Sequence, residues 1–82
     1  MSTLLSRAAR PDVRNPILAL PAAARLHALP LESRQALRAV LLDLSTDARA
    51  RADHSWRTAK GPMAVYWRSI SVYARHIARL LI

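Results

Sequence analysis

KGPMAVYWRSISVYARHIARLLI, residues 60–82, is the stretch that decides the fold of this chain. After its Gly61–Pro62 step, apolar residues recur at alternating spacings of four and three, in the series Met63, Trp67, Ile70, Ala74, Ile77 and Leu81. This spacing is the period of one face of an α-helix. It predicts a helix over residues 62–82 that packs its apolar face on the rest of the chain.

A second long helix is predicted immediately before this step, because residues 31–60 contain no proline and no glycine. Their apolar and small residues share one helical face, which consists of Leu37, Leu41, Leu44, Ala48, Ala52, Ser55 and Ala59, with Val40 beside them. The second half of this face carries small side chains, so a neighbouring element can approach closely there. We expect Gly61 to end the helix in the left-handed conformation and Pro62 to begin the next one.

Prolines at positions 11, 16, 21 and 30 divide the first thirty residues, which predicts short helices or turns there. Ser2 or Thr3 is expected to cap a short helix ending near Arg10, and Asn15 to cap a helix that begins at Pro16. Further helix starts are expected at residues 21 and 30. An alternative for residues 21–44 is a helix-turn-helix with its turn at residues 28–30. No alternating β pattern competes, so we predict one all-α domain over residues 1–82, a small helical bundle.

An 82-residue chain buries only roughly 60–65% of its unfolded surface, so its own core is small. The apolar arcs of the two long helices exceed what short N-terminal helices can cover. We therefore expect a homo-oligomer, with a dimer as the first expectation. The candidate core or oligomer residues are Leu37, Leu41, Leu44, Trp56, Met63, Trp67, Ile70 and Ile77.

Both tryptophans of the chain lie close to the Gly61–Pro62 step. Their places on the two apolar faces predict that Trp56 and Trp67 pack near each other and anchor the core at this corner. The alternative is an exposed aromatic and arginine platform, since arginine follows each tryptophan. Such a platform can stack on bases and hold phosphates.

The chain is strongly basic, with 13 Lys and Arg against 5 Asp and Glu and a formal net charge of +8. No acidic residue follows Asp53, whereas the candidate basic stripe for a partner consists of Arg57, Lys60, Arg68, Arg75 and Arg79. The last three lie within about 40° of one another at 100° per residue. Codon bias in a GC-rich genome also enriches arginine, and a solvated helix face also carries charge. The one-sign stripe nevertheless predicts a partner that is nucleic acid or an acidic surface of a nucleoprotein complex.

Catalytic and metal-binding patterns are absent from the sequence. The chain has no cysteine, its three histidines share no helical face, and its single glycine cannot form a phosphate-binding loop. No paired carboxylates suggest acid–base catalysis. We therefore expect no enzymatic activity, no metal, no cofactor and no small-molecule substrate. Without a signal peptide or a long apolar stretch, we expect no membrane span and a cytoplasmic location.

In its small size and its Ala, Arg and Leu bias, the chain resembles small proteins from phages and mobile elements of high-GC bacteria. Some of those are regulators, and some inhibit host nucleoprotein machines, as anti-CRISPR proteins do; no site residue carries over from this resemblance. The first functional expectation is a non-catalytic regulator that binds nucleic acid or a nucleoprotein complex. The alternatives are a phage-type inhibitor that docks on a host protein, and a basic helix on an anionic membrane surface. The expected burial of Met63, Trp67, Ile70 and Ile77 argues against the membrane alternative.

Overall fold

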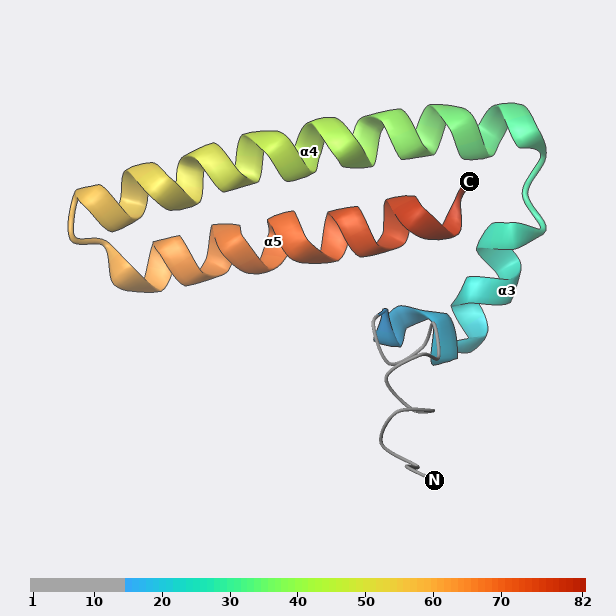
Figure 1. Cartoon of the computed structure of the whole chain (residues 1–82), viewed down its shortest axis with the longest axis horizontal. Helices are drawn as coiled ribbons and strands as arrows, with labels where there is room; N and C mark the ends of the chain where they lie inside the picture. The colour runs from blue at the N-terminus through green and yellow to red at the C-terminus, as the bar shows by residue number, and fades with distance from the viewer. Residues whose placement is uncertain (1–14) are drawn as a thin grey trace, which may run out of the picture.

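A computed structural model describes residues 15–82 of the chain and confirms the predicted all-α class, since no strand occurs within that range. A 3-10 helix, η1 (Pro16–Ala19), leads into the short helix α3 (Pro21–His27). Two long helices follow, α4 (Leu31–Arg57) and α5 (Gly61–Leu80), and they run side by side as a hairpin (Figure 1). Over the same residues, no helix combines the length and the apolarity needed to cross a bilayer.

The contact between α4 and α5 is built of alanine and serine. Every buried residue of α4 is small: Ser45, Ala48, Ala52 and Ser55. On α5 the buried set is Ala64, Ser71, Ala74, Ala78 and Leu80. The alanines and serines recur at spacings of three, four or seven residues, so they form one stripe on each helix, whereas Leu80 lies on another side of α5. The expectation that a neighbouring element approaches closely on the small half of α4 is confirmed.

A pair of serines links the two helices at the middle of this contact. The Ser45 hydroxyl donates to the Ser71 backbone carbonyl at 2.8 Å, and the two hydroxyl oxygens lie 3.2 Å apart. Both residues are buried, so the bonds form away from water. Hydroxyls with partners of this kind fix the register of the hairpin without leaving a buried polar group unpaired.

The face that α5 turns toward α4 differs from the predicted one. The predicted seam has its centre near Met63 and Ile70, but the buried stripe is rotated by roughly 60° around the helix, at 100° per residue. As a result Met63 is 46% exposed, and Trp67, Ile70 and Ile77 are only half-buried. The burial that argued against a membrane role is therefore partial.

On α4 the larger apolar residues are also incompletely covered. Leu37 and Leu41 are half-buried, and Leu44 is 40% exposed. The physical reason is the same on both helices, because alanine and serine allow the backbones to approach closely. Large side chains then lie beside the contact instead of within it.

The corner between the long helices is tight, but Gly61 does not make it in the predicted way. No glycine in the described chain has a positive φ, and the residue with φ of 60° is Ala59. Because α4 ends at Arg57, earlier than expected, the left-handed position after the helix falls on Ala59. Gly61 instead becomes the first residue of α5, ahead of Pro62.

The backbone bonds at the corner have the pattern of a Schellman motif. The Lys60 N–H donates to the Ser55 carbonyl at 2.8 Å, and the Ala59 N–H donates to the Trp56 carbonyl at 3.2 Å. These bonds satisfy the carbonyls that the end of α4 leaves open. Ala59 therefore adopts the left-handed conformation that glycine usually adopts at this position, and its Cβ makes that conformation strained.

The N-terminal elements pack on α5 and on each other, on the opposite side of α5 from α4 (Figure 1). The helix starts predicted at residues 16, 21 and 30 are confirmed within two residues. The Asn15 side chain makes no capping bond; its Nδ2 donates to the His76 carbonyl at 2.9 Å. The elements of the helix-turn-helix alternative are present, since α3, a turn and α4 follow one another, but α3 makes its main contacts with η1 and α5. The helix expected before Arg10 lies outside the described residues.

The helices form a single layer, with extents of 44 × 41 × 16 Å. The radius of gyration is 15.4 Å, whereas a compact chain of this size has about 11–12 Å. A helix with its side chains is about 10–12 Å across, so the shortest extent holds little more than one helix. The two broad faces of the layer are therefore both open.

Candidate functional site

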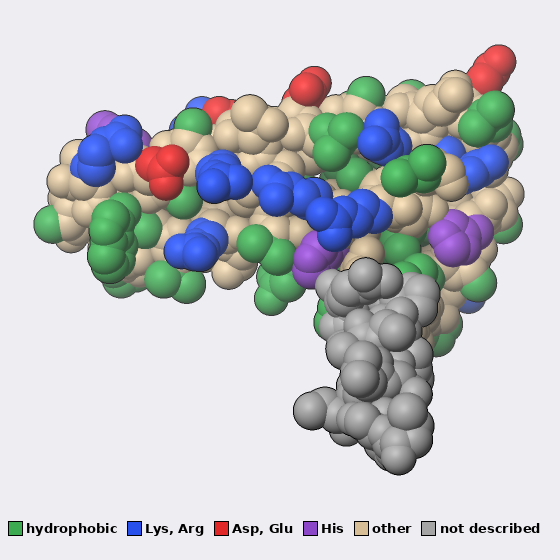
Figure 2. Space-filling view, in the orientation of Figure 1, with side chains coloured by type: hydrophobic (Ala, Val, Ile, Leu, Met, Phe, Trp, Pro, Cys, Tyr) green, Lys and Arg blue, Asp and Glu red, His purple; other side chains and the backbone are tan. Residues whose placement is uncertain are grey.

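One broad face of the hairpin carries a groove of about 470 Å³ between α4 and α5. The helix α4 contributes Arg49, Ala52, Asp53 and Trp56 to its lining, and α5 contributes Ala64, Val65, Arg68, Ser71, Val72 and Arg75. The floor is the alanine and serine contact, because small side chains leave a furrow between the helices. Longer side chains on either side form the walls of the groove. Figure 2 shows a row of Lys and Arg side chains that follows the line between the two helices on this face.

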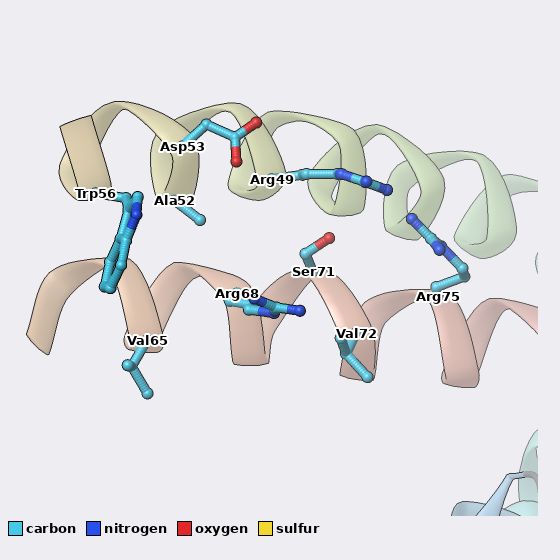
Figure 3. A pocket seen from close by; sticks show the side chains of 10 residues that line it. Arg49, Ala52, Asp53, Trp56, Val65, Arg68, Ser71, Val72 and Arg75 are labelled. Carbon is cyan, nitrogen blue, oxygen red and sulfur yellow. The ribbon is translucent and has the colours of Figure 1, made fainter. Parts of the chain in front are cut away.

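Three arginines converge in the groove from two helices. Arg68 and Arg75 are seven residues apart, two helical turns, so both project from the same side of α5. Arg49 projects from α4, and Figure 3 shows Arg49 and Arg75 extending toward one another across the groove. Arg75 is half-buried, while Arg49 and Arg68 are exposed.

The groove arginines lack acidic partners among residues 15–82. The ion pair in that part of the chain joins Arg51 to Asp47 at 3.2 Å, and neither residue lines the groove. Asp53 is the one acid in the lining, and it makes no ion pair with the arginines. None of the three groove guanidinium groups is in an ion pair with that acid, so their combined positive charge favours an anion between them.

Trp56 marks the Asp53 end of the groove. Its side chain is 72% exposed, and Figure 3 shows it extending from α4 across toward α5. The prediction that Trp56 anchors the core beside Trp67 is therefore wrong. The position of Trp56 agrees with the alternative expectation of an exposed aromatic beside arginines.

Trp67 has a different role, away from the groove. It packs edge to face on Tyr66, with ring centroids 5.2 Å apart, and the Arg51 guanidinium lies 5.3 Å from its ring centroid. Arg51 is in turn held by its bond to Asp47. These contacts join the two helices on the flank opposite the groove, so the two tryptophans face different sides of the layer.

The predicted basic stripe is divided by the structure. Arg68 and Arg75 line the groove, and Arg79 is exposed one turn further along α5. Arg57 and Lys60 are exposed near the corner between the long helices and do not line the groove. Arg75 is half-buried at the edge of the helix contact, because the rotation of the buried stripe brings that side of α5 close to α4.

Sequence reasoning missed Arg49, which no stripe on α4 indicated. Its signal is the spacing of seven between Arg49 and Trp56, with Ala52 between them, at the edge of the small-residue face. That spacing places the three side chains on one side of the same helix. The opposing arginines become visible only when α5 is placed beside it.

A scan against protein-family models and searches of curated proteins and of solved structures give no match to this chain.

Proposed function

We propose that this chain is a non-catalytic binding protein that holds nucleic acid through phosphate contacts in the arginine groove. The observation that carries the proposal is the convergence of Arg49, Arg68 and Arg75 without an acidic partner among residues 15–82. Guanidinium groups bind phosphate oxygens bidentately, and each such contact releases counterions from the nucleic acid. The exposed Trp56 ring at the end of the groove adds a surface for stacking.

The charge of the whole chain supports the same partner. A net charge of +8 on 82 residues gives a long-range attraction for a polyanion and speeds its association. The groove then supplies fixed contacts on one face. Attraction by net charge alone would be spread over the whole surface. Substitutions inside and outside the groove can therefore distinguish binding in the groove from general attraction to the surface.

The test is a salt titration of nucleic-acid binding with two matched triple variants. The groove variant carries Arg49→Gln, Arg68→Gln and Arg75→Gln. The control variant carries Arg25→Gln, Arg57→Gln and Lys60→Gln, which removes the same charge from exposed positions outside the groove. Each phosphate contact contributes a slope of about 0.7–0.9 in log affinity against log salt. We expect the groove variant to lose about two to three units and the control less than one.

Equal losses in the two variants would contradict a groove-based site and leave only general attraction. Absence of binding to any nucleic acid at low salt would refute the proposal. The groove would then be assigned to an acidic protein surface, as in the alternative of an inhibitor that docks on a host complex. Circular dichroism of each variant checks that the helices persist.

We also propose that the flank opposite the groove binds a second copy of this chain. A stable domain is usually built of two or more packed layers, whereas this hairpin forms one layer 16 Å thick. Large apolar side chains remain exposed on both helices, among them Val40, Leu44 and Met63. A second copy supplies the missing layer and leaves the basic groove open on the outer face.

Sedimentation equilibrium at micromolar concentration tests this assembly. Leu44→Glu should shift the population toward monomer, because an unpaired carboxylate would be buried in the interface. Ala50→Glu, at an exposed position on the same helix, is the matched control and should leave the assembly intact. A wild-type chain that stays monomeric at high concentration would refute the second-copy proposal.

A further inference from the structure

We infer that the groove takes a single strand of nucleic acid, with one unpaired base stacked on Trp56 and the following phosphates on the three groove arginines. This inference rests on the proposed function and narrows it from nucleic acid in general to an unpaired strand. Three observations carry it: the position of the arginines in the valley between two helices, the exposed tryptophan at one end, and the acid beside it.

The position of the arginines disfavours a duplex. The major groove of B-DNA is about 12 Å wide and admits one α-helix. The helices α4 and α5 lie in contact, and two helices of about 10–12 Å each make a ridge of roughly 20 Å. That ridge cannot enter the major groove, so a duplex would rest on its crests. Arg75, which is half-buried in the valley, would then be out of reach.

A single strand is thin enough to lie in the valley itself. Trp56 and Arg49 are seven residues apart on α4, which places them about 10 Å apart along the helix axis. That length spans about three nucleotides at a stacked spacing of about 3.4 Å. The volume of about 470 Å³ suits a short stretch of strand. Arg68 and Arg75 line the opposite wall, so phosphates in the valley meet cations from both helices.

Trp56 gives the groove a base-binding end. The ring is 72% exposed in the monomer, so its apolar faces are available for stacking and the core does not depend on them. An aromatic ring beside a cationic channel is the usual arrangement in proteins that bind single strands, because every base has a flat face to stack. A duplex presents no such face except at its ends.

Asp53 gives the groove a direction. It lines the same end as Trp56, where its carboxylate repels phosphate and can accept a hydrogen bond from the amino group of a base. The arginines occupy the rest of the groove. A strand that places a base at the Trp56 end and its phosphates toward Arg75 therefore complements the charges along the whole length of the groove.

The experiment measures fluorescence anisotropy of a labelled twelve-residue single strand of mixed sequence and of its duplex. We expect the wild-type chain to bind the single strand at least about 10-fold more tightly than the duplex at equal salt. Trp56→Leu, which keeps an apolar side chain but removes the aromatic face, should weaken single-strand binding by roughly 10-fold. Trp56→Phe should restore most of that loss. Neither change should alter duplex binding or the helical circular dichroism, because the side chain is exposed.

The outcomes separate this inference from the proposed function. Duplex binding as tight as single-strand binding, or a Trp56→Leu chain with unchanged affinity, overturns the single-strand site, while loss of binding in the groove-arginine variant still supports phosphate binding. No binding to either probe at low salt overturns both. A free mononucleotide that competes at the concentrations at which the oligonucleotide competes would assign the groove to small nucleotides and overturn the single-strand assignment.

Discussion

Ala48→Leu tests whether the helices of this chain are held together by close contact of small residues. Ala48 is 0% exposed and lies on the stripe that α4 turns toward α5, between Ser45 and Ala52. The residues that α5 presents are also alanines and serines, which are too small to move out of the way by changing rotamer. Three additional carbon atoms at position 48 can be accommodated only if the two backbones separate.

The expected cost follows from that geometry. Overpacking a well-packed site costs about 1–3 kcal/mol, and we expect the upper part of this range because backbone has to move. Domains of this size have a free energy of unfolding of about 4–12 kcal/mol, so the loss is a large fraction of the total. At about 4–8 °C per kcal/mol, the melting temperature should fall by roughly 10–20 °C.

Thermal melting followed by circular dichroism at several protein concentrations measures the effect. Ala50→Leu is the control, because Ala50 is exposed on the same helix and leucine is nearly as good a helix former as alanine. The control should change stability by less than about 0.5 kcal/mol. Equal melting temperatures for the two variants would refute the close small-residue contact as the basis of the fold.

Three further changes probe the corner and the serine pair. Ala59→Gly should stabilise the chain by about 1 kcal/mol, since glycine adopts a φ of 60° without strain, and an unchanged or lower melting temperature would contradict the strained corner. Gly61→Ala should also stabilise, by about 0.4–1 kcal/mol, because its φ is not positive and an added Cβ meets no atom within 4 Å; destabilisation in denaturant unfolding would show that this position needs glycine after all. Ser45→Ala should cost about 1 kcal/mol through loss of the bond to Ser71, and a neutral result in the same assay would mean that this bond contributes nothing to stability.

The long helices and their order follow from the sequence, because their periodicity is strong and proline and glycine divide them. Their ends do not follow, since helix boundaries inferred from patterns vary by about two to four residues, and α4 ends three residues before its predicted end. That uncertainty is enough to move the left-handed position from Gly61 to Ala59. A pattern also gives weight to large apolar residues, so it selected Met63 and Trp67 as the seam of α5 where alanine and serine make the closer contact.

The candidate site could likewise be predicted only in part, because a sequence pattern places residues along one helix but does not show how two helices face each other. Arg68 and Arg75 were predicted because they repeat along one helix, and both line the groove. Arg49 belongs to the other wall, and only the register of the hairpin places it opposite them. The exposure of Trp56 depends on the rotation of α4 about its axis, which a single apolar stripe does not determine to better than a few tens of degrees.

The alanine and serine contact also determines where conformational entropy is lost. Alanine has no side-chain rotamers to lose on burial, whereas methionine and arginine lose about 1.5–2 kcal/mol each. Folding of this hairpin therefore orders few side chains, and the longer ones, such as Met63, Arg49 and Arg68, stay exposed in the folded chain. Under the proposed function, their ordering is deferred until a nucleic-acid strand fills the groove or a second copy covers the opposite flank. Binding should accordingly carry an unfavourable entropy that the folded monomer has not yet incurred, and substitutions that stiffen the groove walls should raise affinity without adding a contact.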